Sequence, residues 1–503
     1  MSKKLIVLVA MLLIGSMLMT GLVSCVGDTG EGDVTTEAPE QTEGNGDGPT
    51  ETELTSGVGN DVNFDGEEVH WYIWKDVTMD EFYVDEMTGD EIQDEIFQRN
   101  KDVQKKYGVT FIYHEEKGSS SHMDEYEKKI EIDFNGDAEY EIMAAYSQLP
   151  VRLSTKGYLA NLNNFKYLDF SQPWWPNQMV SDLTINNNLY FCTGDISMNL
   201  LWMMTILYFN KDLAEDYQLG NLYELVDNYE WTQDKLLELT ADIFTDVNGN
   251  GKKDNDDKYG LGICSVSFDG FMTASGTTSI IKDKGTDLFT INPDFFGEKM
   301  TNMIDTGIKI YESRGTRYYT DTNAKVRANF GTGNVVFWAD RTFCGAREFQ
   351  AEGADVTFGV LPIPMFDGLQ KQYYTNVGYP FSLYTINSNV MEEERMDKVS
   401  AVLQEMAFRS YRDITPEVFD TALKNRYSDE PDDARMFDLI KENIKFEISR
   451  FLNQEVGNTA SSGYRTTIIS GQNTWSSTAN KNYKVLNYEL GELNKAWTKG
   501  TEK

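Results

Sequence analysis

The chain has 503 residues, which is enough for two domains, because single hydrophobic cores rarely grow beyond ~250–300 residues. Hydrophobic residues make up 40% of the chain, which is typical of a globular protein. The formal net charge is −36, from 81 acidic and 45 basic residues. A chain this acidic is not expected to bind nucleic acid, since contacts with phosphates need clustered Lys and Arg.

The N-terminus has the pattern of an export signal. A short positive segment precedes an apolar run from Leu5 to Met19, which is too short for a comfortable transmembrane helix. The tetrad Leu22-Val23-Ser24-Cys25 follows, and it resembles the bacterial lipoprotein signal, in which cleavage exposes a cysteine that is then acylated. We therefore expect residues 1–24 to be a signal peptide and Cys25 to carry a lipid. An ordinary signal peptide with an incidental cysteine is the alternative.

Residues 25–67 are predicted to form a disordered acidic tether. From Cys25 to Glu68 the chain carries 13 acidic residues and no Lys or Arg, and large apolar residues are almost absent before Phe64. Such a composition buries too little apolar surface to fold, and its charges repel one another.

The rest of the chain alternates strand and helix patterns. We expect strands at 69–74, 109–113 and 140–146, with helices at 90–107 and 123–133 between them. This alternation predicts a parallel sheet with crossover helices. Further strands are expected at 334–338, 357–361 and 379–386, and helices near 391–409, 433–446 and 480–497. The predicted class is therefore α/β, in two lobes with a helical C-terminal extension.

Residues 246–257, DVNGNGKKDNDD, have most of the pattern of a calcium-binding EF-hand loop. The candidate ligands are the side chains of Asp246, Asn248 and Asn250, the backbone carbonyl of Lys252, Asp254 through a water, and Asp257. Thr232 is placed to cap an entering helix that runs to about Phe244, whereas Lys258–Gly262 has the pattern of a turn and a strand. We therefore predict a structural calcium site and not a paired sensor; a turn without metal is the alternative.

No catalytic motif stands out in the sequence. His-Glu-x-x-His, the phosphate-binding glycine loop and the Gly-x-Ser-x-Gly elbow are all absent. His70 and His114 lie in or beside apolar strand patterns, so we interpret them as structural. Cys192, Cys264 and Cys344 are widely spaced and indicate packing, not a disulfide framework. Carboxylate pairs for glycoside hydrolysis stay open, because sequence spacing does not reveal their separation.

Aromatic residues next to polar ones indicate a sugar-binding site. Pro173-Trp174-Trp175-Pro176 has the composition of an exposed loop with paired indoles, and Trp338 is closely followed by Asp340 and Arg341. Flat rings stack on the C–H faces of sugars, while polar neighbours bind the hydroxyl groups. Core packing is the alternative for each indole.

Several stretches together resemble the extracellular solute-binding proteins of bacterial ABC importers, in the carbohydrate-type group. They are Leu207–Leu213, Leu222–Val226 with Trp231-Thr232, Asp246–Gly260, Phe358–Pro364, and Tyr427–Asp429 before Met436–Ile440. The resemblance implies a two-lobed, periplasmic-binding-protein-like fold of the class II type that closes on its ligand by a hinge.

The resemblance also implies how the chain is divided between the lobes. Lobe 1 would comprise 68–192 plus 359–386, and lobe 2 would comprise 193–358 plus 387–503. The chain would cross near Cys192-Thr193, Phe358-Gly359 and Ile386. We expect ligand contacts from Trp74, Tyr146, Trp174 and Trp175 on one side, from Trp202, Trp338, Asp340 and Arg341 on the other, and from Tyr379 near the hinge. Arg341 would bind an acidic group of the ligand or pair with Asp340.

The function implied by the resemblance is capture of a solute, chiefly a sugar or oligosaccharide, for delivery to ABC permease subunits. The protein would be a monomer anchored by lipid at the extracellular face of the cell membrane, in the periplasm if the bacterium has an outer membrane, and no catalytic residues are expected. A peptide is a second possible solute. Two other functions remain open: a surface glycan hydrolase, and a sensory or adhesion lipoprotein on the same fold.

Overall fold

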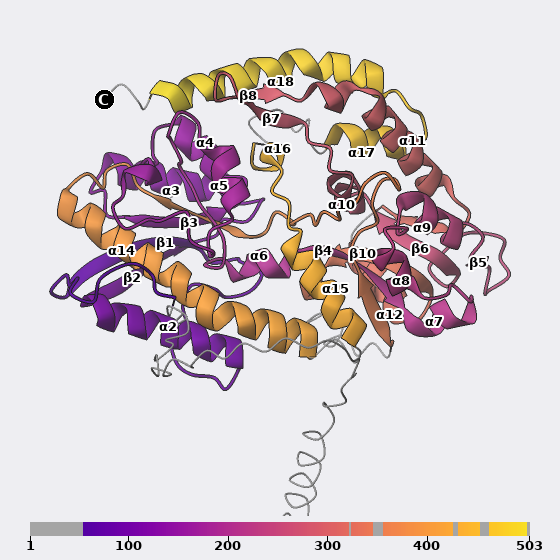
Figure 1. The fold of residues 1–503 in the computed structure, drawn as a ribbon, viewed down its shortest axis with the longest axis horizontal. Helices are drawn as coiled ribbons and strands as arrows, with labels where there is room; N and C mark the ends of the chain where they lie inside the picture. The colour runs from indigo at the N-terminus through magenta and orange to yellow at the C-terminus, as the bar shows by residue number, and fades with distance from the viewer. Residues whose placement is uncertain (1–53, 321–322, 346–355, 426–430, 453–461, 500–503) are drawn as a thin grey trace, which may run out of the picture. The chain divides into compact units, whose positions relative to one another are not determined.

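The computed structural model describes residues 54–320, 323–345, 356–425, 431–452 and 462–499 (Figure 1). The predicted signal peptide, Cys25 and most of the predicted tether lie outside these ranges. The described residues form a four-stranded sheet, a six-stranded sheet and a two-stranded ribbon, with helices around them. Among the helices of this part of the chain, none is both long and apolar enough to cross a membrane.

The four-stranded sheet belongs to the first lobe and has the order β12-β3-β1-β2. Its strands are β1 (Glu67–Trp74), β2 (Val109–Glu116), β3 (Ile142–Tyr146) and β12 (Ser382–Ile386). Strand β1 runs parallel to β2 and β3, whereas β12 is antiparallel to β3. The expected parallel arrangement is confirmed for β1, β2 and β3. A strand also lies within the predicted range 379–386, although it begins at Ser382 and is antiparallel.

The helices of this lobe include three that the sequence predicted, α2 (Glu91–Tyr107), α3 (Met123–Asn135) and α14 (Glu393–Arg409), and three shorter ones that it did not predict. The shorter ones are α4 (Pro150–Thr155), η1 (Leu162–Asn164) and α5 (Asn177–Leu183). The Asp90 side chain accepts a hydrogen bond from the Gln93 N–H and so caps the start of α2. Gly108 ends α2 in the left-handed conformation, with φ of 59°, which a glycine adopts without strain.

Helix α14 packs on α2 and holds the end of the predicted tether against the first lobe. The buried Glu405 carboxylate accepts hydrogen bonds from Lys106 Nζ at 2.7 Å and from Ser56 Oγ at 2.5 Å. Val58 and Phe64 are also buried. The predicted tether is therefore wrong for residues 55–66, since these side chains reach core sites despite the acidic composition. The assignment of α14 to the second lobe is wrong as well.

The six-stranded sheet belongs to the second lobe, with the order β11-β4-β10-β6-β5 and with β9 beside β6. Its strands are β4 (Thr205–Asn210), β5 (Phe244–Thr245), β6 (Lys258–Cys264), β9 (Thr316–Tyr319), β10 (Val335–Arg341) and β11 (Phe358–Leu361). Strand β11 pairs antiparallel with β4, so Gly359 lies opposite Phe209. The prediction that 359–361 belong to the first lobe, and that the chain crosses at Phe358-Gly359, is therefore wrong.

Further elements of the second lobe and its surroundings follow in chain order. They are α6 (Met198–Trp202), α7 (Lys211–Asp216), α8 (Leu222–Asp227), α9 (Gln233–Thr240), α10 (Ser267–Ala274), the ribbon β7 (Ile280–Asp283) and β8 (Leu288–Ile291), η2 (Pro293–Phe296), α11 (Glu298–Glu312) and α12 (Asn323–Gly331). Thr232 caps α9 by accepting a hydrogen bond from the Lys235 N–H, as predicted. The helix ends at Thr240, earlier than the expected Phe244, which lies in β5.

The C-terminal region is helical, as predicted. Its elements are the π-helical turns η4 (Ser410–Ile414) and η5 (Glu417–Asn425), followed by α15 (Pro431–Glu442), α16 (Ile448–Phe451), α17 (Ser462–Ile469) and α18 (Trp475–Thr498). Helix α18 packs on α4 of the first lobe as well as on β8 and α11 (Figure 1). The Trp497 indole donates to Ser154 Oγ at 2.8 Å. This helix therefore contacts both lobes, and its assignment to the second lobe alone is incomplete.

The chain crosses between the lobes after Cys192 and again before β12. Cys192 pairs with Tyr384 of the first sheet, while Met204, just before β4, pairs with Val377. The first crossing lies near the predicted Cys192-Thr193, but the second lies between β11 and β12. After Ile386 the chain stays with the first lobe through α14, so the predicted third crossing at Ile386 is wrong.

One prediction concerns Asp433 in the first turn of α15. Its carboxylate is 1% exposed and accepts hydrogen bonds from Tyr223 Oη at 2.6 Å, the Val360 N–H at 2.9 Å and Lys211 Nζ at 2.9 Å. Substitution Asp433→Ala should lower the free energy of unfolding by about 3 kcal/mol, because it leaves buried donors without an acceptor. Chemical denaturation measures this loss.

The neighbouring Asp432 provides a matched control, because its carboxylate is 48% exposed and contacts Arg435 at the surface. Asp432→Ala should change the free energy of unfolding by less than about 1 kcal/mol. Equal losses in the two variants would contradict the anchoring role of Asp433.

Candidate functional site

A pocket of about 400 Å³ lies where the strand ends of the two lobes meet. Both lobes, the connection before β12 and the helices α16 and α17 contribute to its lining. The first lobe provides Ser120, Tyr146 and Gln148, and the second provides Thr205, Val266, Ser267, Asp269, Ala339, Asp340 and Arg341. The connection provides Asn376, Gly378, Tyr379 and Pro380, and the two helices provide Arg450 and Arg465. The carboxyl ends of β3 and β10 both open onto it. Crevices at strand ends are the usual ligand sites of α/β proteins.

The aromatic part of the pocket consists of two tyrosines. Tyr146 is the last residue of β3 and lies opposite Ser382 of β12. Burial and the neighbouring Tyr379 raise the pKa of Tyr146, so its hydroxyl group stays neutral at physiological pH. The Arg450 guanidinium lies over the Tyr379 ring, with its Cζ atom 4.1 Å from the ring centroid. This is a cation–π contact.

The charged part of the pocket is organised around Asp269, in the first turn of α10. The buried Asp269 carboxylate accepts hydrogen bonds from Arg450 Nη1 at 3.0 Å and from Arg465 Nε at 2.6 Å. Burial acts to raise the pKa of Asp269, but the charges of Arg465 and Arg450 outweigh it and hold this pKa below its ordinary value. Asp269 therefore fixes α16 and α17 at the edge of the pocket.

A second ion pair, between neighbouring residues, lies at the end of β10. Arg341 Nε lies 3.2 Å from Asp340 Oδ1, and the Arg341 N–H donates to the same oxygen at 2.8 Å. The Arg341 guanidinium also packs over the Phe343 ring. In this structure Arg341 pairs with Asp340, which is one of the two roles that the sequence left open.

The pocket is more basic than the protein around it. Its lining holds three guanidinium groups, from Arg341, Arg450 and Arg465, against the two carboxylates of Asp269 and Asp340. The chain as a whole has a net charge of −36. The local excess of positive charge is therefore a property of the pocket and not of the general composition.

Of the residues predicted to bind ligand, Tyr146, Asp340, Arg341 and Tyr379 line this pocket together. The five predicted tryptophans do not. Trp74, Trp174, Trp175, Trp202 and Trp338 are each at most 1% exposed. The prediction therefore placed both tyrosines of the pocket and the polar end of β10 correctly, but it was wrong for the tryptophans.

The tryptophans fill the core instead. The Trp175 indole donates to Gln404 Oε1 of α14 at 3.1 Å, and Trp174 packs edge-on against Phe408 of the same helix. Trp74 lies behind Tyr146, with 5.5 Å between ring centroids. The prediction of an exposed loop at 173–176 is wrong, because α14, more than 200 residues later, covers it.

Sequence reasoning missed Asp269, Arg450 and Arg465. Asp269 carries a usable signal, since it stands alone as a charged residue in the otherwise uncharged helix Ser267–Ala274. A charged side chain in such a run is expected to be paired when buried. Arg450 and Arg465 lie in short C-terminal helices, and no local pattern assigns them to the pocket.

The predicted calcium loop connects the antiparallel strands β5 and β6. The buried Asp257 carboxylate accepts hydrogen bonds from the Val247 N–H at 3.1 Å and the Asp254 N–H at 3.0 Å. The Asp246 carboxylate accepts from the N–H groups of Gly249 and Gly251. A strand follows the loop, as predicted, and the backbone winds around the two outer carboxylates. These hydrogen bonds hold the shape of the loop, and binding of calcium stays a prediction.

No family model matches the chain, and no curated protein matches it in sequence. Solved structures do match. A cyclo/maltodextrin-binding protein complexed with maltotetraose superposes with a TM-score of 0.55 at 14% identity, over 84% of this chain and 97% of that one. An ABC substrate-binding protein from Listeria monocytogenes, in complex with cycloalternan, superposes with a TM-score of 0.50 at 12% identity, over 87% of this chain and 100% of that one. UgpB from Mycobacterium tuberculosis, in complex with glycerophosphocholine, superposes with a TM-score of 0.51 at 16% identity, over 84% of this chain and 98% of that one.

The chain has the fold of the solute-binding proteins of ABC importers. This confirms the predicted fold class, an α/β, two-lobed arrangement like that of maltose-binding proteins. In this solute-binding fold the pocket lies between a sheet from each lobe, and helices after Ile386 complete it.

A second prediction follows from the Asp269 ion pairs. Asp269→Asn should lower the free energy of unfolding by about 3 kcal/mol at pH 5–8, because it leaves two guanidinium groups without their buried counter-charge. Since the folded-state pKa of Asp269 is lowered, its contribution is present above the ordinary value of 3.8 and is lost as pH falls through the folded value. The difference between wild type and variant should therefore shrink only below about pH 4.

Urea unfolding across this pH range tests the prediction. Asp242→Asn, the same change at an exposed aspartate of the second lobe, is the control and should change stability by less than about 0.5 kcal/mol. A constant difference down to pH 2, or no difference at pH 7, would contradict the proposed ion pairs.

Proposed function

We propose that the chain is the extracellular solute-binding component of an ABC importer, and that the 400 Å³ pocket captures its solute. The observation that carries this proposal is the position of the pocket. It joins strand ends from both lobes to residues of the connecting segment, so closure of the lobes around a hinge would enclose a solute. The superposed proteins, which bind maltotetraose, cycloalternan and glycerophosphocholine, support this function.

A sugar or oligosaccharide is the first candidate solute. The rings of Tyr146 and Tyr379 offer flat faces for the C–H surface of a pyranose. Gln148, Ser267 and Asn376 offer amide and hydroxyl groups that can donate to and accept from sugar hydroxyls. No bond needs to break for this task.

A solute with an anionic group is the second candidate, and the arginines favour it. Three guanidinium groups face two carboxylates in the pocket lining. A guanidinium binds a carboxylate or phosphate through two parallel hydrogen bonds, which a neutral sugar cannot match. A sugar acid, a sugar phosphate or a phosphodiester would supply the missing negative charge.

Anchoring and delivery complete the proposal. Export by the N-terminal signal, a lipid at Cys25 and the acidic segment after it would hold a monomeric receptor at the extracellular face of the cell membrane, near its permease subunits. We propose a binding protein without enzymatic activity. Release of product from labelled oligosaccharides would favour the glycan hydrolase instead, whereas a gene neighbour that encodes a sensor kinase would favour the sensory lipoprotein.

Thermal unfolding in the presence of candidate solutes tests the function. The panel contains neutral oligosaccharides, uronic acids, sugar phosphates and glycerophosphodiesters. One class should raise the melting temperature progressively with concentration, because the solute binds the native state alone. At 100 times Kd the free energy of unfolding should rise by about 2.7 kcal/mol. Calorimetry then gives the affinity for that solute.

Variants of the pocket locate the binding and separate the two solute classes. Tyr379→Ala should weaken binding of either class at least tenfold, since it removes a stacking face. Arg341→Ala should weaken an anionic solute far more than a neutral one. Trp338→Phe, a change in the core behind the pocket, is the control and should keep affinity within about threefold. Binding that survives Tyr379→Ala and Arg341→Ala unchanged would place the solute elsewhere.

We further propose that residues 246–257 bind a structural calcium ion. Asp246→Ala and Asp257→Ala should abolish the rise in melting temperature that calcium gives to the wild type, because each removes a carboxylate ligand. Asp256→Ala, an exposed aspartate of the same loop outside the ligand set, should keep the full calcium effect. Calorimetric unfolding with calcium and with a chelator measures both. Retained calcium stabilisation in the first two variants, or a loss of solute affinity without a loss of stability, would overturn the structural role.

A further inference from the structure

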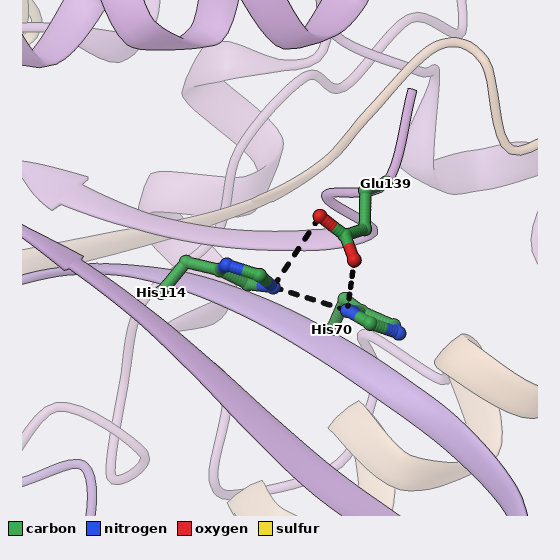
Figure 2. Close-up of side chains that lie close together, drawn as sticks. All are labelled: His70, His114 and Glu139. Carbon is green, nitrogen blue, oxygen red and sulfur yellow. Dashed lines mark hydrogen bonds and ion pairs between the residues drawn. The ribbon is translucent and has the colours of Figure 1, made fainter. Parts of the chain in front are cut away.

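Two of the three histidines of the chain lie in contact on the first sheet. His70 Nδ1 is 3.0 Å from His114 Nε2, and Figure 2 shows both rings turned toward the carboxylate of Glu139. Glu139 Oε1 lies 3.5 Å from His70 Nδ1, and Glu139 Oε2 lies 3.9 Å from His114 Nε2. Among the residues that the structure describes, this is the one cluster of three His, Cys, Asp or Glu side chains whose ligand atoms converge, all within 4.8 Å of one another.

The strand register brings the two imidazoles together. In the parallel pair of β1 and β2, Tyr72 lies opposite His114, and His70 is two residues before Tyr72. Residues two apart on a strand point to the same face, so both imidazoles lie on one face of the sheet as diagonal neighbours. The interpretation of these histidines as isolated structural residues, made from the sequence, did not include this contact.

The third group is held by the backbone before β3. The Glu141 N–H donates to the His70 carbonyl, and the His70 N–H donates to Glu141 Oε2 at 3.0 Å. Two residues earlier, the Glu139 N–H donates to Asp133 Oδ1 at 2.8 Å. These hydrogen bonds, one at Glu139 itself and two at Glu141, place Glu139 over β1.

The spacing of the three ligand atoms fits a small divalent ion. In a tetrahedral site with bonds of 2.0–2.1 Å, neighbouring ligand atoms lie about 3.3 Å apart. The two nitrogens lie 3.0 Å apart, close to this edge length, and each has a different Glu139 oxygen near it, at 3.5 Å from His70 Nδ1 and at 3.9 Å from His114 Nε2. One ligand atom from each of the three residues lies within 4.8 Å of the others, so small side-chain rotations would bring all three to one ion. Imidazole nitrogens with one carboxylate oxygen are a donor set for zinc-like transition metals, and less so for calcium.

The second nitrogen of His70 has the partner that metal-binding histidines usually have. His70 Nε2 lies 3.2 Å from Glu68 Oε2. A carboxylate on the far side of the ring fixes the tautomer, so that Nδ1 presents its lone pair to the ion. The ring of Tyr140 packs against His114 at 4.9 Å between centroids and orients the second imidazole.

Access and charge also favour a cation. The side chains of His70, His114 and Glu139 are 17%, 26% and 49% exposed, so an ion can reach them from solvent. The adjoining surface hollow, of about 460 Å³, is lined by Glu67, Glu68, His70, Asp137, Ala138, Glu139, Glu141, Arg395 and Lys398. Five carboxylates against two cations leave a net negative charge there.

We propose that His70, His114 and Glu139 bind one divalent transition-metal ion of the zinc class, with water completing the coordination. The ion would connect β1, the edge strand β2 and the segment before β3, and so stabilise the outer edge of the first sheet. This site is separate from the solute pocket, whose lining shares no residue with it, and from the predicted calcium loop in the second lobe.

Zinc titration of the chelator-treated, full-length protein tests the proposal, with calcium in excess so that the loop at 246–257 does not compete. Calorimetric titration in competition with a chromogenic chelator should show one saturable zinc site. Zinc should also raise the melting temperature. His114→Ala and His114→Gln should both abolish saturable binding and the thermal shift, while circular dichroism confirms folding. Glu68→Gln should weaken binding by about tenfold, the effect expected of an outer carboxylate.

His122→Ala is the matched control, because the third histidine contacts Asp76 and Ser119 instead of this cluster. It should bind zinc as the wild type does. Cobalt(II) gives a second readout, through visible absorption bands that should disappear in His114→Gln and Glu139→Gln. The absence of a saturable zinc site in the wild type, or undiminished binding in His114→Gln, would overturn the proposal. Equal losses in His122→Ala and His114→Ala would do the same.

Discussion

A buried carboxylate, Glu81, connects the segments that run between the two lobes. It accepts hydrogen bonds from the Asn199 N–H, from Ser197 Oγ and from Ser382 Oγ, which belong to the two crossing segments. Burial raises the pKa of Glu81, while these donors act to lower it. Because Glu81 lies in the loop after β1, it links the first sheet to both connections at once. These hydrogen bonds hold the start of β12, which pairs with β3, next to the segment that leads to β4.

Other buried carboxylates attach the C-terminal helices in the same way. Asp433 holds α15 on β11, Glu405 holds α14 on α2, and Asp269 holds α16 and α17 on α10. Such pairs often contribute little net stability, since desolvation offsets their attraction, but they specify one arrangement. Here the arrangement concerns the pocket: Asp269 holds both Arg450 and Arg465 at its edge, and the Val377 carbonyl also accepts a hydrogen bond from Arg450. The region after β12 therefore contributes directly to the proposed binding site.

The acidic composition is distributed unevenly, and this separates three regions of different chemistry. The pocket has an excess of guanidinium groups, the hollow beside His70 has an excess of carboxylates, and the loop at 246–257 presents oxygen atoms. The ligand proposed for each is different: a solute with hydroxyl or anionic groups, a transition-metal ion, and calcium. The two metal proposals concern opposite lobes and imply structural support for each, whereas recognition of a solute needs both lobes.

Local patterns in the sequence predicted the α/β class, several of the longer helices and strands, and the strand after residues 246–257, because hydrophobic periodicity, caps and turn glycines act over a few residues. The resemblance to solute-binding proteins, and not local patterns alone, suggested Tyr146, Asp340, Arg341 and Tyr379, which line the pocket. Only the tertiary structure decided which aromatic side chains are exposed, since α14 covers Trp174 and Trp175 from more than 200 residues away. The pairing of β11 with β4, the contact of His70 with His114 and the arrival of Arg450 and Arg465 at Asp269 are likewise long-range. Packing and strand register set them, and no short segment of the chain encodes either one alone.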